Sequence, residues 1–396
     1  MKPKYETTMT ACFIGYIVQA IVVNFVPLLF LTFHSNYHIP LSKITMLITV
    51  NFGIQLLIDL LSAGFIDKIG YRASIILAHI FSAIGLILLA ILPELCSDPF
   101  TGIVIAVIFY AVGGGLIEVL ISPIMESCPT DNKEKAMSLL HSFYSWGQVG
   151  VVLISTLFFK LFHIENWKIL SLLWSLIPII NAVIFLKTPI APLVQEGESG
   201  LTMKELFSNK LLWTFLLMMM SAGASEQAVS QWTSTFAEQA LKVNKTVGDL
   251  AGPMTFAVLM GISRVYYGKY GSKINLDRFM MYSSILCIIS YLSIAFIPHP
   301  ILGFIGCGLC GLSVGILWPG TLSKAAASIK NGGTTMFALL ALAGDLGCTT
   351  GPTLAGIISG RFQDNLRIGI LSAIIFPLLL LLGLIICKRF ITRFRH

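Results

Sequence analysis

The chain has 396 residues, of which 56% are hydrophobic and only 11% are charged, and its mean hydropathy is +0.85. Soluble globular proteins carry roughly a quarter charged residues, so this composition excludes that class and indicates a polytopic membrane protein. The net charge of +7 is explained by membrane topology and anionic lipid, and we expect no nucleic acid partner.

Apolar runs of about 20 residues, each long enough to cross a bilayer, recur along the whole sequence. They predict an all-α membrane protein with twelve transmembrane helices. The expected cores of these spans are residues 9–32, 42–64, 73–93, 101–127, 137–159, 168–187, 210–236, 247–268, 279–297, 300–324, 334–358 and 368–387.

An even number of spans places both chain ends on the same side of the membrane. Most of the 26 Lys and Arg residues fall on that side, and the positive-inside rule therefore predicts cytoplasmic termini. We expect a multi-pass protein of the cell membrane, either a plasma membrane or a bacterial inner membrane, with the lipid bilayer as its surroundings.

The longest polar stretch inside the chain, residues 188–208, predicts a cytoplasmic linker between an N-terminal half, 1–187, and a C-terminal half, 209–396. Short motifs recur on both sides of it in the same order. Parallel six-helix repeats with a substrate site at their interface are a recurring transporter architecture. The matched motifs are Gly147-Gln148-Val149-Gly150 with Gly344-Asp345-Leu346-Gly347, Gly115 and Pro123 with Gly311 and Pro319, and Gly15 and Gln19 with Gly223 and Gln227.

A carboxylate lies in the middle of the apolar span 101–127, where Glu118 follows three consecutive glycines. An ionised carboxylate at this depth costs several kcal/mol unless it faces water, a partner or a substrate. We therefore expect Glu118 to couple transport to a proton. Glu226 and Asp345 of the second half are the candidates for a further coupling carboxylate.

Amide and aromatic side chains in several spans indicate a site for a hydrogen-bonding substrate; the alternative is a polar seam between helices. Asn51, Gln55 and Asp59 recur every four residues and should line a cavity or a helix interface. A rigid aromatic ring beside amides and carboxylates suits sugars. The candidate substrate-binding residues are Gln19, Asn24, Tyr144, Gln148, Glu226, Gln227, Gln231, Trp232 and Trp318.

The loop after the second span contains Gly64-Phe65-Ile66-Asp67-Lys68-Ile69-Gly70-Tyr71-Arg72. This pattern resembles the loop 2–3 motif of the major facilitator superfamily, and a degraded copy around Arg264 follows in the second half. The resemblance implies a cytoplasmic gate, while the alternative is a tight turn whose charges fix the topology. The candidate gating residues are Gly64, Asp67, Lys68, Gly70, Arg72 and Arg264.

Four windows resemble one branch of this superfamily, the fucose–galactose–glucose:proton symporters and their fucose-permease-like relatives. The windows are Glu118 followed by Pro123, Leu139-Leu140-His141-Ser142-Phe143-Tyr144, Gly223 to Trp232, and Gly315 to Ser323. The resemblance implies the major facilitator fold and proton coupling through Glu118. The branch also carries an acidic residue in its first helix, where this chain has only Asn24, so coupling through that pair is not carried over.

The function that these patterns favour is a secondary active transporter that moves a small polar solute, most of all a sugar, by proton-coupled alternating access. The alternatives are a proton-coupled exporter of amphipathic drugs or metabolites and a sodium-coupled sugar symporter. A membrane enzyme or sensor is disfavoured because no HExxH, Walker or GxSxG pattern occurs, and a channel because the polar residues form no continuous file. We expect a monomer without cofactor or metal, with H+ or Na+ as the coupling ion and a small molecule as substrate.

Overall fold

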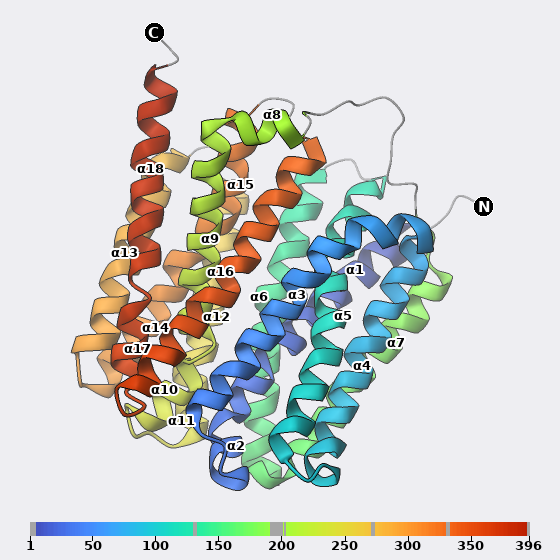
Figure 1. The fold of residues 1–396 in the computed structure, drawn as a ribbon, viewed down its shortest axis with the longest axis vertical. Coiled ribbons are helices and arrows are strands. Elements are labelled where there is room, and N and C mark those ends of the chain that lie inside the picture. The colour runs from blue at the N-terminus through green and yellow to red at the C-terminus, as the bar shows by residue number, and fades with distance from the viewer. Residues whose placement is uncertain are drawn as a thin grey trace. The chain divides into compact units, whose positions relative to one another are not determined.

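The structure is a computed structural model that describes residues 5–129, 133–190, 201, 203–270, 274–329 and 333–393. All regular elements among these residues are helices (Figure 1). The chain forms two compact units. Unit 1 comprises Met1–Gln195 together with Asn244–Met254, and unit 2 comprises Glu196–Val243 together with Thr255–His396.

Unit 1 is built from helices of the first half of the sequence and one short segment of the second half. Its elements are α1 (Tyr5–Asn24), η1 (Val26–Leu29), α2 (Phe30–Tyr37), α3 (Leu41–Ile69), α4 (Tyr71–Leu95), α5 (Pro99–Ser127), α6 (Lys133–Phe162), η2 (Ile164–Asn166), α7 (Trp167–Lys187), α11 (Lys245–Asp249) and η3 (Leu250–Met254).

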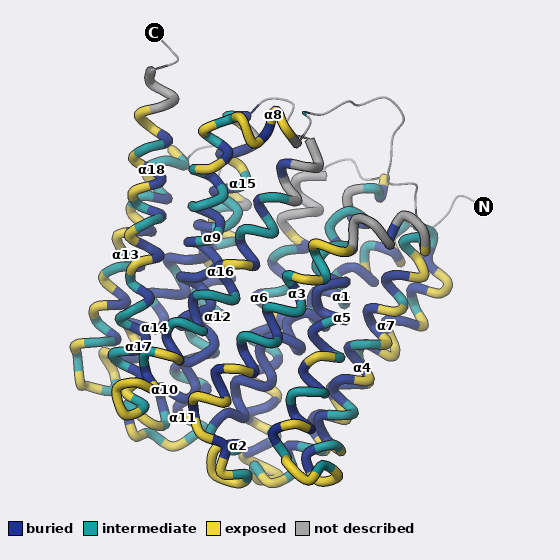
Figure 2. Tube along the Cα trace, viewed as in Figure 1, coloured by how far each residue is buried: buried dark blue, intermediate teal, exposed yellow. Residues whose placement is uncertain are grey.

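Unit 2 contains the remaining helices. They are α8 (Met203–Ser208), α9 (Lys210–Ser230), α10 (Thr233–Gln239), α12 (Thr255–Tyr270), α13 (Leu276–Phe296), α14 (Pro300–Val314), α15 (Leu317–Ser328), α16 (Gly333–Arg361), α17 (Leu366–Ser372) and α18 (Ile375–Arg393). Within unit 1, exposed residues lie around α2 and the loop between α4 and α5, and also along the outer faces of long helices such as α7 (Figure 2).

Ten helical stretches of the described residues are long and apolar enough to cross a membrane. The expected spans that fall outside this set, 210–236 and 334–358, correspond to α9 with α10 and to α16. Polar residues, among them Glu226 and Asp345, lower the hydropathy of these helices. When these two helical stretches are included, the helices of the described residues form twelve spans. The all-helical membrane fold expected from the sequence is confirmed.

The helix starts follow from local side-chain chemistry. Asp98 caps α5 by accepting hydrogen bonds from the Phe100 N–H at 3.2 Å and the Thr101 hydroxyl at 2.9 Å. The bond from Thr101 holds the pKa of Asp98 below its ordinary value. The same capping recurs where an asparagine side chain accepts a backbone N–H at the start of a helix, as at Asn209, Asn244, Asn275 and Asn365.

The first helical rod of each sequence half breaks at the same place of the repeat. α1 ends at Asn24 and continues through η1, where Pro27 lacks an N–H for a helical hydrogen bond. α9 ends at Ser230, and α10 begins at Thr233. Irregular backbone inside a membrane is tolerated only where it is buried in protein or lines a cavity. The two breaks therefore mark parts of these helices that are shielded from lipid.

The segment Asn244–Met254 packs within unit 1 although it follows α10 in the sequence. The ammonium of Lys245 donates to the Leu28 carbonyl at 2.6 Å and pairs with the Asp249 carboxylate at 3.1 Å. The Thr156 hydroxyl of α6 lies 3.5 Å from that carboxylate, which is fully buried. A buried ion pair with these extra contacts fixes the segment against α6 and the break after α1.

A glycine seam joins α9 and α16 in unit 2. A Cβ atom at Gly347 would lie 1.9 Å from the Met220 carbonyl oxygen, and one at Gly351 would lie 2.4 Å from that of Ala224. Only glycine permits two helix backbones to approach so closely. At Gly150, the residue that corresponds to Gly347 in the repeat, a Cβ would meet nothing within 4 Å.

We expect Gly347→Ala to lower the thermal unfolding temperature in detergent, because overpacking at a backbone contact costs about 1–3 kcal/mol. Gly150→Ala is the matched control and should leave the temperature unchanged or raise it, since alanine favours a helix over glycine by about 1 kcal/mol. Equal shifts in the two variants would contradict the seam.

Candidate functional site

Unit 1 holds a chain of amide side chains that ends on Glu118. Gln19 of α1 donates from Nε2 to Oε2 of Glu118 on α5 at 2.8 Å and to Oε1 of Gln55 on α3 at 2.9 Å. Gln55 in turn donates to Oδ1 of Asn51 at 3.1 Å. The four-residue repeat of Asn51 and Gln55 seen in the sequence is therefore a buried polar face of α3 that packs near α5 and reaches Gln19 of α1 through Gln55.

Small residues on α5 make room for this chain. A Cβ at Gly114 would lie 2.9 Å from Oε1 of Gln19, and one at Gly115 would lie 3.0 Å from the Cα of Gln55. The glycines before Glu118 thus let α1 and α3 approach α5 closely enough for amide contacts with its carboxylate. Glu118 itself is only half-buried, whereas Gln19 is 1% exposed.

A second polar contact joins α1 and α5 about one helical turn away from the first. The Tyr16 hydroxyl and the Ser122 hydroxyl lie 3.0 Å apart, and the Tyr16 ring lies 5.3 Å from the ring of His141 on α6. The sequence analysis did not select Tyr16 or Ser122 as site residues. The only signal was that Ser122 precedes Pro123, where the symporter branch has asparagine.

Unit 2 holds a charged cluster on α9 and α12. The guanidinium of Arg264 donates to Oε2 of Glu226 at 3.0 Å, and both side chains are largely buried. Gln227 donates to Oε1 of Glu226 at 3.3 Å, and Gln231 donates to Oε1 of Gln227 at 3.0 Å. The candidate residues of this helix therefore form one hydrogen-bonded group with an ion pair at its end.

Trp232 requires a correction. We expected either Trp232 or Trp318 to offer a flat stacking surface, but Trp232 is fully buried and its indole N–H donates to the Pro352 carbonyl at 3.0 Å. The ring packs α9 against α16 at the helix break. Trp318 is half-buried, and a Cβ at Gly344 would lie 2.2 Å from its ring, so the glycine lets the indole lie against α16.

The remaining candidates occupy buried or half-buried positions. In unit 1, Asn24 is buried at the break after α1 and its amide donates to the Ala20 carbonyl of its own helix at 2.9 Å. Tyr144 is half-buried and Gln148 is buried on α6. In unit 2, Asp345 is 8% exposed on α16. The expected carboxylates are thus divided, with Glu118 in unit 1 and the other two in unit 2.

The loop motif after the second span is described only in part, because the surroundings of Gly64, Asp67 and Lys68 lie outside what the structure describes. Gly70 has a φ of +87° and forms the turn between α3 and α4. The guanidinium of Arg72 donates to the carbonyl groups of Phe185 and Leu186 at 2.9 Å each. This arginine thereby satisfies backbone acceptors at the C-terminal end of α7.

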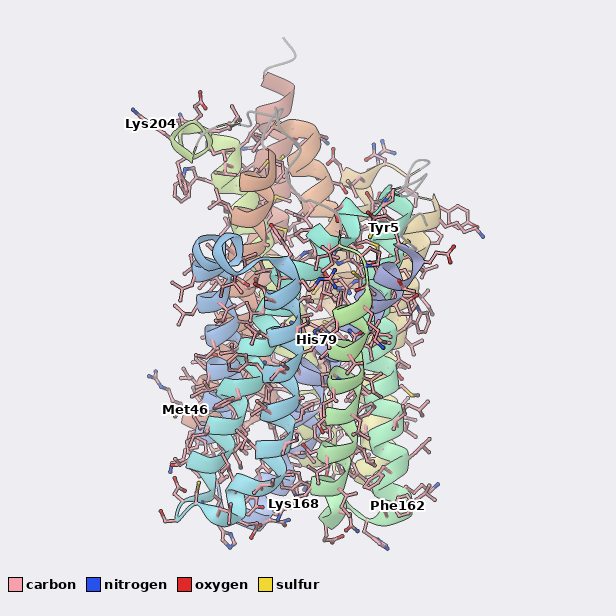
Figure 3. The ribbon with its side chains drawn as sticks, turned by 90° about the vertical axis from the view of Figure 1, so that its right-hand side faces the viewer. Tyr5, Met46, His79, Phe162, Lys168 and Lys204 are labelled. Atoms are coloured by element: carbon pink, nitrogen blue, oxygen red, sulfur yellow. The ribbon has the colours of Figure 1, made fainter. Side chains whose placement is uncertain are left out.

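A histidine that the sequence analysis passed over lies in the interior of unit 1 (Figure 3). His79 is fully buried on α4, with Nδ1 2.7 Å from the Ile75 carbonyl and Nε2 2.7 Å from the amide nitrogen of Asn181. Asn181 also donates to the Ala11 carbonyl at 3.0 Å. A neutral imidazole with N–H on Nδ1 satisfies both contacts, so His79 ties α4 to α7 and α1.

Comparison with known proteins identifies the fold. A family model described as Major Facilitator Superfamily matches residues 9–352, whereas no curated protein sequence matches the chain. Similar solved structures include a bacterial homolog of the human lysosomal transporter Spinster, inward-facing and occupied, with TM-score 0.78 and 14% identity over 98% of both chains.

Two sugar transporters share the fold at similar distance. A variant of the Escherichia coli fucose:proton symporter has TM-score 0.65 and 14% identity, covering 97% of this chain and 98% of its own. A D-xylose–proton symporter has TM-score 0.77 and 13% identity, covering 96% of this chain and 97% of its own.

The ion pair in unit 2 gives a stability prediction. Arg264→Met should destabilise the protein strongly, because it leaves a buried carboxylate without its cation, a loss of about 3–5 kcal/mol. Adding Glu226→Gln should restore most of the stability, since the double variant buries no uncompensated charge. Thermal unfolding in detergent measures both, and a double variant that unfolds as early as the single one would refute the pairing.

Proposed function

The chain belongs to the major facilitator superfamily, and from this premise we propose that it is a secondary active transporter of a small polar solute, in the first instance a sugar, driven by protons through alternating access. Family membership makes it a multi-pass membrane transporter and not an enzyme. The observation that carries the proposal is the hydrogen bond from Gln19 to Glu118 in the middle of an apolar helix.

This contact supports a proton-coupling role because it stabilises one protonation state of Glu118. The amide of Gln19 favours the ionised carboxylate through a charge-assisted hydrogen bond. A protonated Glu118 is neutral and costs less to seal from water. Access of water and closure of the site therefore favour opposite states of the same group, which is what coupling to a proton requires.

The polar group of unit 2 supports a hydroxylated substrate. Gln227 and Gln231 present amides beside Glu226 and Arg264, and Trp318 provides an indole ring that is half-buried. Amides and acids bind hydroxyl groups while an aromatic face meets C–H groups, which favours a sugar over an amphipathic drug. The fucose and D-xylose symporters, whose names state a sugar and a proton, share the fold.

Sodium coupling is the second candidate, and one observation favours it. Oε1 of Gln19 is buried and receives no hydrogen bond from the described residues, and its amide partner is the Glu118 carboxylate. A carboxylate with an unsatisfied amide oxygen nearby is a suitable set of oxygen ligands for a hard cation. A hydroxyl of the substrate would satisfy the same oxygen.

We propose that the protein resides in the cell membrane with both termini cytoplasmic. The excess of Lys and Arg on the side of the termini supports this orientation. The small-molecule partner that we propose is the transported solute.

We expect the purified protein to be stabilised by sugars in a thermal-shift screen that also contains nucleosides and cationic drugs, at two pH values. A ligand at 100 times its Kd stabilises the native state by about 2.7 kcal/mol, so a binding sugar gives a measurable shift. A response to cationic drugs with none to any sugar would reverse our ranking of substrates.

Once that screen has supplied a solute, proteoliposomes test the coupling. Glu118→Gln should abolish accumulation driven by an imposed pH gradient while solute exchange across the membrane continues, because only the titrating group is lost. Glu94→Gln is the matched control, since the Glu94 side chain is 58% exposed at the end of α4, and it should leave uptake unchanged. Unchanged proton-driven uptake in Glu118→Gln disproves the role. Loss of a sodium-driven uptake instead would favour the second candidate.

A further inference from the structure

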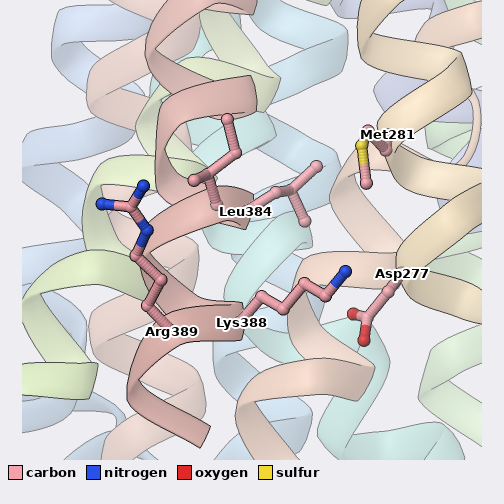
Figure 4. Close-up of a pocket in the computed structure, with 6 residues that line it drawn as sticks. Asp277, Met281, Leu384, Lys388 and Arg389 are labelled. Atoms are coloured by element: carbon pink, nitrogen blue, oxygen red, sulfur yellow. The ribbon is translucent and has the colours of Figure 1, made fainter. Parts of the chain in front are cut away.

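Unit 2 contains a pocket between α13 and α18 that the transport mechanism does not use (Figure 4). Its volume is about 210 Å³, and it is lined by Asp277 and Met281 of α13 and by Leu384, Ile385, Lys388 and Arg389 of α18. Figure 4 shows the Lys388 and Asp277 side chains pointing toward one another across it. Charged and apolar groups thus share one small cavity.

The charge of this pocket is positive. Lys388 and Arg389 are exposed, and Asp277, the one acid among the described residues that line the pocket, forms an ion pair with Lys324 of α15. The Lys324 side chain is 8% exposed and the Asp277 side chain 48% exposed, so the pair lies at the edge of the unit. The lining residues thus include two cations and one carboxylate, and both cations are exposed.

The apolar side of the pocket continues into exposed helix surface. On α18 the exposed residues Leu378, Leu382 and Ile385 lie on one face, because they are spaced by four and three residues, and Arg389 follows four residues later. On α13 the same spacing joins the exposed residues Arg278, Tyr282, Ile285 and Ile289. Each helix thus presents an apolar stripe that begins at a cation.

We propose that this pocket binds the phosphate headgroup of an anionic phospholipid, whose acyl chains lie along the two stripes. A cationic group at the end of an apolar groove matches a lipid, which joins a phosphate to hydrocarbon. Basic pockets between membrane helices are suited to anionic headgroups. The ordinary explanation of Lys388 and Arg389, that they fix topology, does not account for the cavity that they line.

The test uses native mass spectrometry of the full-length protein in detergent, titrated with phosphatidylglycerol, with zwitterionic phosphatidylcholine or with inorganic phosphate. We expect phosphatidylglycerol to bind, and Lys388→Gln with Arg389→Gln to weaken it at least about ten-fold, since each surface cation near anionic lipid contributes about 1 kcal/mol. Asp277→Asn should strengthen it, because the competing carboxylate is removed.

The matched control is Lys204→Gln with Lys210→Gln, which removes the same charge from exposed positions of unit 2 away from the pocket. It should change phosphatidylglycerol binding less than two-fold. Equal losses in the two double variants, or equal binding of phosphatidylcholine, would overturn the lipid site. Inorganic phosphate that binds as tightly as phosphatidylglycerol would show a site for a free anion instead. None of these outcomes depends on the transported solute.

Discussion

A hydrogen-bonding group inside a bilayer must find its partner within the protein, because hydrocarbon offers none. Both units meet this constraint with glutamines that correspond in the sequence repeat. Gln19 donates to Glu118 in unit 1, and Gln227 donates to Glu226 in unit 2. The carboxylates themselves do not correspond, since one lies on α5 and the other on α9 beside its glutamine. The glutamine therefore occupies the same place in both halves of the sequence, whereas the carboxylate lies on different helices. The two units are chemically different although their helices correspond.

This difference separates the roles of the two acids. Glu226 receives a guanidinium of Arg264 at 3.0 Å and forms a largely buried ion pair with it. Glu118 receives the amide of Gln19, a donor that carries no charge. The acid of unit 2 thus meets both a cation and an amide of its own helix, whereas the acid of unit 1 meets an amide from another helix.

The sequence predicted the features that depend on local composition. Hydropathy located the spans, and the spacing of Asn51 and Gln55 identified the inner face of α3. The polarity of residues around Glu226 indicated a hydrogen-bonded helix. Contacts between distant segments were beyond its reach. From the sequence, Trp232 is a candidate aromatic residue for substrate binding. In the structure its N–H donates to the Pro352 carbonyl. Nothing near Lys245 or Asp249 in the sequence indicates that Leu28 and Thr156 are their partners, because such contacts depend on tertiary packing.

The segment Asn244–Met254 has a consequence for how this fold can be taken apart. Unit 1 ends within a continuous helical run, at the π-helical turn of η3 that contains Pro253, and α12 of unit 2 begins at the next residue. A polypeptide cut at the linker would leave the N-terminal fragment without the lysine that satisfies the Leu28 carbonyl and without the acid beside Thr156. The first six spans alone would therefore lack two contacts that η1 and α6 make in the whole chain. These two positions of the first half thus receive their partners from a segment that the ribosome synthesises only at the start of the eighth span.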